Sequence, residues 1–150
     1  MIAYPAEMDI QEISDHLEIQ QLIARYGKAV DRKDWDLYRA VFTEDAFIDY
    51  TSAGGTASGV EEMVTWLDAA LGQFPATQHL VANFDINIDG DNATAEIMFH
   101  NPMVMPDKSV WQTGGWYHHE LVRTPNGWRS QKLIEESAYF SGMPDNLTTP

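Results

Sequence analysis

The sequence predicts an α+β fold in which N-terminal helices pack on one side of a curved antiparallel sheet. Apolar residues recur with helical spacing in the first half of the chain, whereas the second half alternates over long stretches separated by short turns. No internal repeat, low-complexity tract or long linker divides the halves, so we expect a single domain over residues 1–150. A sheet that curls over helices forms a cone-shaped barrel, and its open end is a natural pocket for a small molecule.

The composition narrows the classes of function. Nine basic and twenty-three acidic residues give a formal net charge of −14, which repels phosphate backbones and anionic membranes. We therefore expect no nucleic-acid partner and no membrane partner. The chain has no cysteine, so disulfides, thiolate nucleophiles and zinc sites with cysteine ligands are excluded. Residues 1–8 lack the pattern of a signal peptide, and no stretch approaches the ~18 apolar residues of a membrane span, so we expect a cytoplasmic protein.

Three helices are expected. Asp9 and Glu12 match a capping box, which predicts that the first helix spans about 10–31. Asp34 is placed to cap a short second helix, and a third is expected over about 60–72, after a glycine-rich loop. The apolar stripe of the first helix consists of Ile10, Ile13, Leu17, Leu22, Ile23, Tyr26 and Val30.

The strands are expected mainly in the second half of the chain. A turn is predicted at 43–45, followed by a first short strand over 46–51. The long strands are predicted over 76–88, 93–105, 110–124 and 128–140, which places the core within about 9–140 and leaves 141–150 as a loose tail. In the first long strand, alternation assigns one face to Gln78, Leu80, Ala82, Phe84, Ile86 and Ile88, and the other to Thr77, His79, Val81, Asn83 and Asp85.

Asp31 and His79 are the candidate acid–base pair. Asp31 is a carboxylate at the point where the first helix ends, and His79 lies near the start of a long strand. An imidazole exchanges protons near neutral pH, and a carboxylate on its other nitrogen fixes its tautomer and stabilises the imidazolium. Spacing alone leaves open a simpler interpretation, in which His79 is a structural histidine of the sheet and Asp31 a surface acid.

Tyr26 and Tyr50 are candidates for polarising a substrate carbonyl. Two phenols that converge on one oxygen stabilise an enolate as charge develops there. Tyr26 also fits the apolar stripe of the first helix, where it could simply fill the core. Tyr26 and Asp31 are five residues apart, about 140° around an ideal helix, so they converge on one point only if the helix bends or ends early.

Aromatic, histidine and methionine side chains of the long strands are expected to bind the substrate. This composition favours a small, flat and largely apolar or aromatic ligand. The expected substrate-binding residues are His100, Met103, Trp111, Trp116, Tyr117 and Phe140. His118 and His119 are adjacent and point to opposite faces, so at most one of them enters the pocket. The histidines show no spacing typical of a metal site, so we expect neither a metal nor a cofactor.

Three segments make the chain resemble a SnoaL-like domain of the NTF2-like superfamily. They are 26–35, 47–50 and 77–79, and the similarity extends over roughly 9–140. In motif the chain is most similar to the scytalone dehydratases and the bile-acid 7α-dehydratases. The resemblance implies a cone-shaped α+β barrel and a catalytic Asp–His pair at Asp31 and His79.

The resemblance also implies roles for further residues. In scytalone dehydratases a tyrosine matching Tyr50 helps to polarise the carbonyl through water, and in the bile-acid enzymes a tyrosine matching Tyr26 lies in the site. Val30 stands where scytalone dehydratases have a second tyrosine, while Gly115 and Tyr117 replace a serine and an asparagine. A second catalytic histidine of those enzymes falls near His100. Scytalone itself is therefore not implied as the substrate.

The sequence therefore predicts a cofactor-independent lyase of the dehydratase type, acting on a small cyclic or polycyclic hydroxy-carbonyl compound. The same residues leave open an isomerase or a polyketide cyclase. A non-catalytic small-molecule-binding module and a protein like a dioxygenase β subunit also remain open. The related dehydratases are trimers, and strands with apolar residues on both faces fit a homotrimer, with a dimer as the second choice.

Overall fold

The computed structural model of the chain describes residues 7–145 and contains three α-helices and seven strands in that range. The helices are α1 (Ile10–Arg32), α2 (Trp35–Arg39) and α3 (Val60–Leu71). The strands are β1 (Phe42–Asp49), β2 (Ala57–Gly59), β3 (Ala76–Thr77), β4 (Leu80–Asp89), β5 (Asn92–Val104), β6 (Val110–Thr124) and β7 (Gly127–Ser141). A short 3-10 helix, η1 (Thr51–Ala53), follows β1. Part of the predicted loose tail belongs to β7, which extends to Ser141, and residues 146–150 lie outside the described residues, as do residues 1–6 of the N-terminal stretch.

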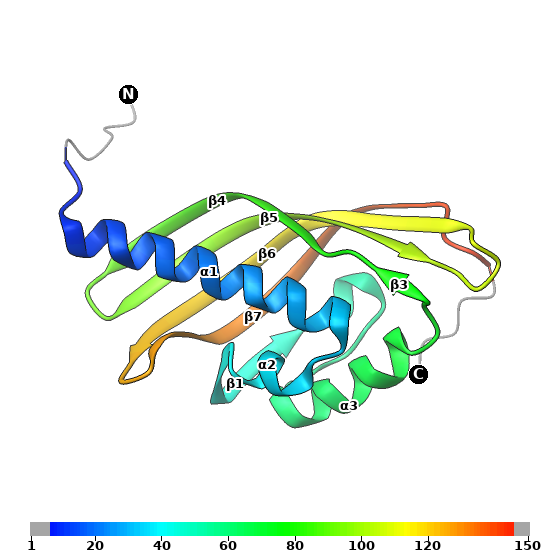
Figure 1. The fold of residues 1–150 in the computed structure, drawn as a ribbon, viewed down its shortest axis with the longest axis horizontal. Coiled ribbons are helices and arrows are strands. Elements are labelled where there is room, and N and C mark those ends of the chain that lie inside the picture. The colour runs from blue at the N-terminus through cyan, green and yellow to red at the C-terminus, as the bar shows by residue number, and fades with distance from the viewer. Residues whose placement is uncertain (1–6, 146–150) are drawn as a thin grey trace.

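The helices pack on one strongly curled sheet that forms a half-barrel (Figure 1), so the predicted α+β class is confirmed. The strand order is β2-β1-β7-β6-β5-β3, and β4 also pairs with β5. The sheet is mixed rather than wholly antiparallel, because β1 pairs with β7 in the parallel direction. The strands β4 to β7 follow one another through short turns, which makes each neighbouring pair antiparallel. No short turn joins β1 to β7, so local sequence does not determine their direction.

The predicted helix caps are confirmed. The side chain of Asp9 accepts a hydrogen bond of 2.8 Å from the backbone N–H of Glu12. α1 ends at Arg32, one residue beyond the predicted end, and Lys33 follows it as the C-cap in the left-handed conformation, with φ 54°. Asp34 then caps α2 by accepting from the N–H of Leu37 at 3.0 Å. Two helices therefore meet at a sharp corner immediately after Asp31.

Two predicted strand features are wrong. Residues 43–45, expected as a turn, lie within β1, where an irregularity between Phe42 and Phe47 shifts the register against β7. In β4 a bulge between Ala82 and Asp85, with Asn83 at φ 50°, interrupts the alternation. Val81 pairs with the buried Phe99, and the side chains partly buried against the core are Val81, Phe84, Ile86 and Ile88. Leu80 and Ala82 therefore face outward, although they were predicted to share a face with Phe84, Ile86 and Ile88.

One end of the half-barrel is closed by a buried charge network. Trp128 is fully buried and its indole N–H donates to Asp15 Oδ1 at 3.0 Å. Arg123 donates two hydrogen bonds of 2.7 Å to the same carboxylate and lies over the Trp128 ring. The hydrogen bonds from Arg123 hold the pKa of Asp15 well below its usual range, against the effect of burial. The free cavity therefore lies toward the other end of the sheet.

Gly115 is expected to tolerate no side chain, in contrast to Gly114 beside it. A Cβ on Gly115 would overlap the backbone carbonyl of Glu136, which cannot move without breaking the strand pairing. A Cβ on Gly114 would meet only the ring of Tyr139, which is 45% exposed and can rotate away. We expect Gly115→Ala to lower the free energy of unfolding by about 2 kcal/mol and Gly114→Ala by much less. Urea unfolding of the two variants measures this; equal losses would contradict the close packing of Gly115 against β7.

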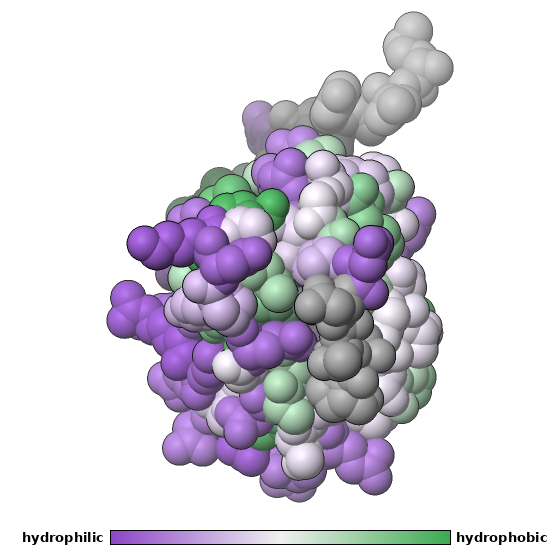
Figure 2. Space-filling view, turned by 90° about the vertical axis from the view of Figure 1, so that its right-hand side faces the viewer, coloured by the Kyte–Doolittle hydropathy of each residue, from purple (hydrophilic) through white to green (hydrophobic). Residues whose placement is uncertain are grey.

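The surface is largely hydrophilic, as expected for a chain with 23 acidic and 9 basic residues. Viewed from the end at which α3 and the β5–β6 turn lie, hydrophilic side chains cover most of the face and hydrophobic ones form smaller patches (Figure 2). In the described part of the chain, no helix is long and apolar enough to cross a membrane.

Candidate active site

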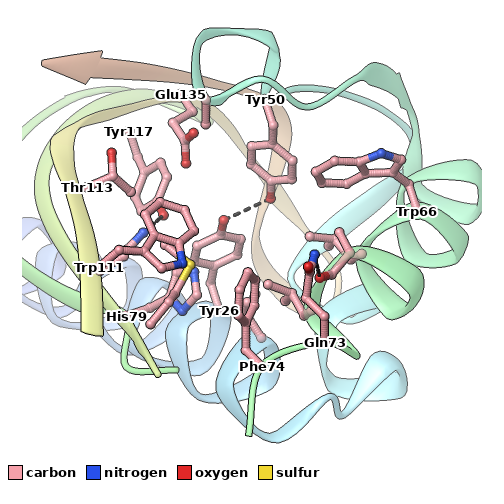
Figure 3. Close-up of a pocket in the computed structure, with 17 residues that line it drawn as sticks. Tyr26, Tyr50, Trp66, Gln73, Phe74, His79, Trp111, Thr113, Tyr117 and Glu135 are labelled. Atoms are coloured by element: carbon pink, nitrogen blue, oxygen red, sulfur yellow. Dashed lines mark hydrogen bonds between the residues drawn. The ribbon is translucent and has the colours of Figure 1, made fainter. Parts of the chain in front are cut away.

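A cavity opens between the helices and the concave face of the sheet (Figure 3). It is partly open to solvent and most of its lining is apolar. This combination is typical of sites that bind small organic ligands. The apolar lining includes Val30, Trp66, Leu67, Leu71, Phe74, Met103 and Trp111. The polar lining includes Tyr26, Tyr50, His79, Asn101, Thr113, Tyr117 and Glu135.

Asp31 and His79 form a close pair at the edge of this cavity. His79 Nδ1 lies 2.6 Å from Asp31 Oδ1. The carboxylate also accepts the backbone N–H of His79 at 2.9 Å and the hydroxyl of Thr77 at 2.9 Å. Burial would raise the pKa of Asp31, but the hydrogen bonds and charge of His79 hold it below its usual value. An ionised carboxylate on Nδ1 fixes the proton there and leaves Nε2 as the nitrogen with a free lone pair.

Helix α1 and the break between β3 and β4 bring the pair together. Residues 78 and 79 interrupt the predicted long strand, because the N–H of His79 bonds to Asp31 and not to a neighbouring strand. Gly27 lies one helical turn before Asp31, on the same face of α1. A Cβ on Gly27 would lie only 3.1 Å from the carbonyl oxygen of His79, so the glycine permits this close approach. Gly27 therefore positions the histidine without touching the cavity.

Tyr26 and Asp31, about 140° apart around an ideal helix, do not need to converge on one point. Helix α1 continues through Arg32, so the helix does not end before Asp31. Tyr26 lines the cavity directly, whereas Asp31 faces the β3–β4 segment and acts on the cavity only through His79. The two side chains thus use different faces of the same helix.

Three phenol hydroxyls meet beside the cavity. Tyr50 Oη lies 2.8 Å from Tyr26 Oη and 3.0 Å from Tyr38 Oη. Two of the three protons are used in these bonds, and the third remains for another acceptor. Tyr26 and Tyr50 line the cavity, whereas Tyr38 is fully buried, so the spare proton is placed to serve the cavity. Burial raises the pKa of all three phenols, so they act as hydrogen-bond donors and not as bases.

Glu135 is a cavity residue that the sequence analysis missed. It is 8% exposed, and its Oε1 has no hydrogen-bond partner within residues 7–145. Burial raises the pKa of Glu135 to about 7; a hydrogen bond with Tyr117 opposes this shift, and the charge of Asp49 adds to it. Glu135 shares its face of β7 with the buried Leu133. An acidic residue on the apolar face of a strand is the sequence feature that could have identified it.

Two further residues that line the cavity each have a buried polar atom without a partner among the described residues. They are Oδ1 of Asn101, an acceptor, and Nε1 of Trp111, a donor. The amide nitrogen of Asn101 donates to Tyr117 Oη at 2.9 Å, which orients the free oxygen. Buried polar atoms are almost always paired, so these groups indicate a ligand with polar atoms of its own.

The predicted substrate-binding residues divide into two sets. Trp111, Tyr117 and Met103 line the cavity. The prediction that His100, Trp116 and Phe140 also line it is wrong. His100 follows the exposed Met98 by two residues and bonds to Gln112 at 2.9 Å, so it lies on the outer face of the sheet.

The remaining placements follow from strand alternation. Trp116 is adjacent to Tyr117, so it points to the opposite face. Phe140 lies near the end of β7 and is 42% exposed. His118 pairs with Glu136 on the outside, while His119 is buried beneath Tyr26 and bonds to Ser130. Over residues 7–145, no group of three or more histidine, aspartate or glutamate side chains is placed to hold a metal.

A family model of the SnoaL-like domain matches residues 11–134. The chain belongs to this family. An uncharacterized protein of Mycobacterium tuberculosis is 40% identical over 138 residues, which cover 91% of this chain and 94% of that protein. The match confirms the resemblance that the three sequence segments indicated.

Solved structures of other proteins share the fold of this SnoaL-like domain. A protein from Kribbella flavida is 28% identical, with a TM-score of 0.80, and the match covers 87% of this chain and 95% of that one. A proposed scytalone dehydratase from Novosphingobium aromaticivorans is 16% identical, with a TM-score of 0.82, over 95% and 97% of the two chains. A hexachlorocyclohexane dehydrochlorinase from Novosphingobium barchaimii is also 16% identical, with a TM-score of 0.79, over 95% and 99%. At this identity the last two show a common fold alone.

Proposed function

We propose that this SnoaL-like domain is a cofactor-independent lyase of the dehydratase type, in which His79 removes a proton next to a carbonyl group. The contact of 2.6 Å between His79 Nδ1 and Asp31 Oδ1 carries the proposal. It fixes the proton on Nδ1 and leaves Nε2 as the base. Two solved structures with this fold bear the names of a dehydratase and a dehydrochlorinase, and both names denote elimination reactions.

Asp31 acts as the orienting group and His79 as the base. Asp31 already accepts from Thr77 and from the backbone of His79, so its charge is held in place before the reaction. When His79 takes up a proton, this fixed negative charge stabilises the imidazolium. Asp31 does not need to accept the proton itself.

The phenol cluster is the group that polarises the carbonyl. The spare proton of the linked hydroxyls of Tyr26 and Tyr50 is placed to donate to an oxygen in the cavity. As the α-proton leaves, negative charge develops on that oxygen, and the donated hydrogen bond strengthens. Because all three phenols resist ionisation, the cluster supplies a donor throughout the physiological pH range.

The cavity favours a small cyclic hydroxy-carbonyl substrate. Trp66, Phe74 and Trp111 supply flat apolar walls, and the free atoms of Asn101 and Trp111 supply hydrogen-bonding groups. A double-bond isomerase or a cyclase would use the same first proton transfer, so it is the closest alternative. A binding module would show no proton transfer at all.

Exchange of α-hydrogens for deuterium tests the proposal without knowledge of the natural substrate. In D₂O, the wild-type protein should accelerate exchange next to the carbonyl of bicyclic ketones such as tetralones, as followed by NMR. Asp31→Asn should slow this exchange by roughly a hundredfold, because the amide no longer stabilises the imidazolium. Asp36→Asn is the control, since the Asp36 side chain is exposed and its hydrogen bond is to Arg39, away from the cavity. Exchange that is absent in the wild type, or equal in both variants, would refute an acid–base role.

We also propose that the outer face of the sheet packs against further copies of the chain, as a trimer first and a dimer second. This face and its edges carry exposed apolar side chains, among them Leu80, Met98 and Tyr139. Light scattering of the purified protein distinguishes the two assemblies. A stable assembly of the chain alone would also speak against a dioxygenase β subunit that requires a larger partner.

A further inference from the structure

Glu135 is a buried carboxyl group that faces the cavity from the side opposite His79 (Figure 3). We propose that Glu135 is the general acid that protonates the departing hydroxyl group, while His79 removes the α-proton. The inference rests on the proposed dehydratase function and adds a second catalytic residue to it. Its first support is that Glu135 lines the cavity and that its buried Oε1 atom has no hydrogen-bond partner within residues 7–145.

The backbone holds Glu135 firmly in position. β7 is central in the sheet, between β1 and β6, and Ile134 pairs with Asp49 of β1. The hydroxyl of Ser52 donates to the carbonyl of Glu135 at 2.6 Å and accepts the N–H of Ser137 at 3.0 Å. A carboxyl group that only filled space would be a poor choice here, because burying an oxygen without a hydrogen-bond partner is unfavourable.

The distance across the sheet between Glu135 and His79 allows the two side chains to act on different bonds of the same ligand. β7 and β4 are three positions apart, and strands lie about 4.8 Å apart, so roughly 14 Å separate them along the sheet. The curl of the half-barrel shortens this distance, and both side chains point into the space between. A base and an acid on opposite sides can act on a C–H bond and a neighbouring C–OH bond of the same ring.

The surroundings of Glu135 favour the protonated form. The groups that interact with it electrostatically are Tyr26 from α1, Tyr38 from α2, Asp49 at the end of β1, and Tyr117 from β6, and Tyr50 lines the same cavity. None of the described residues lining the cavity is lysine or arginine. With burial and the charge of Asp49 acting together, the pKa of Glu135 rises to about 7, so much of the population carries a proton near neutral pH. A carboxylic acid kept neutral in this way can donate to a leaving group.

The proposed step is balanced. His79 Nε2 takes the proton from the α-carbon, and the electrons of that C–H bond form the new C=C bond. The C–O bond of the β-hydroxyl breaks, and the departing oxygen takes the proton of Glu135 to leave as water. Glu135 is then a carboxylate and His79 an imidazolium. Solvent at the open mouth of the cavity returns the proton from His79 to Glu135.

A single-residue mechanism is the alternative, in which the imidazolium of His79 gives its proton back to the leaving hydroxyl. The two mechanisms differ in which residue supplies the proton that a poor leaving group requires. If Glu135 is the acid, its loss affects only substrates whose leaving group needs a proton. If His79 performs both transfers, replacing Glu135 affects no leaving group more than another.

The test compares β-hydroxytetralone with β-acetoxytetralone in the wild type and Glu135→Gln. Acetate leaves as a stable anion, whereas hydroxide must be protonated. We expect Glu135→Gln to slow elimination of water by roughly 10²–10³-fold while retaining elimination of acetate and α-deuterium exchange. The wild-type kcat for water elimination should fall as the pH rises above about 7, where Glu135 loses its proton, and the variant should lack this fall.

Two variants serve as controls. Glu136→Gln changes the adjacent carboxylate, which faces outward and bonds His118, and should leave both eliminations unchanged. Glu135→Asp retains an acid and should recover part of the water elimination. Equal loss of both eliminations, or no loss of either, in Glu135→Gln would overturn the role of Glu135. A wild type without α-exchange would instead refute the dehydratase function, and the inference with it.

Discussion

Replacing His79 by alanine is expected to slow turnover by about 10²–10⁴-fold, the contribution typical of general acid–base catalysis. His79 supplies the only imidazole among the described residues that line the cavity, and its Nδ1 is already bonded to Asp31. The phenols cannot replace it as a base, because burial makes them hold their protons, and Glu135 faces the cavity from the opposite side. The α-proton therefore has no efficient acceptor in the variant.

The fold should survive this change. Asp31 loses one hydrogen bond but keeps Thr77 and the backbone N–H at residue 79, and its side chain is 22% exposed and can bind water. His100→Ala is the matched control: its backbone pairs with Leu80, next to His79, but its side chain lies on the outer face. Initial rates and circular dichroism of both variants make the comparison. Near wild-type turnover in His79→Ala, or equal losses in the two variants, would remove His79 from the mechanism.

The parts of the site that sequence could predict are those set by helical spacing and local caps. Asp31 lies where α1 meets the corner capped by Asp34, and both features follow from the pattern of nearby residues. Tyr26 lies on the apolar stripe of the same helix. A short motif around His79 completed the pair, although no periodicity shows that residues so far apart in the chain meet.

What sequence could not predict depends on how strands pair at a distance. The parallel pairing of β1 with β7 carries Asp49 and Ser52 to Glu135, and no turn between those segments encodes it. The bulge at Asn83 reverses the faces of β4, which a strict period of two cannot anticipate. Trp116 is a different case, since its adjacency to the inward-facing Tyr117 already excludes it from the cavity.

Glu135→Gln is expected to stabilise the protein at alkaline pH and to leave its stability almost unchanged in acid. Burial raises the pKa of Glu135 from 4.5 to about 7, so the folded state binds this proton more tightly than the unfolded state. Below the unfolded pKa both states are protonated, and the residue has no pH-dependent effect on stability. As the pH rises from about 4.5 through about 7, the unfolded state ionises first and wild-type stability falls.

The size of the effect follows from the shift. One pKa unit corresponds to about 1.4 kcal/mol, so the loss reaches on the order of 3 kcal/mol above neutral pH. Glutamine is neutral at every pH and keeps nearly the same shape, so the variant escapes this loss. Asp31 has the opposite pH dependence, because its lowered pKa gives stability that is lost in acid. Wild type and Glu135→Gln both contain Asp31, so its contribution cancels when their stabilities are compared.

Urea unfolding of wild type, Glu135→Gln and Glu136→Gln at about pH 4, 6 and 8 measures the prediction. The advantage of Glu135→Gln should grow with pH and level off above about pH 7, whereas Glu136→Gln, altered on the exposed face, should show no such rise. A constant difference across the range would mean that Glu135 ionises normally, and a neutral acid in the cavity would then be untenable. If the rise is observed, an uncompensated carboxyl group destabilises the folded protein at the pH at which it would work. A carboxyl group that destabilises the fold at its working pH is better explained by proton donation to a ligand than by packing.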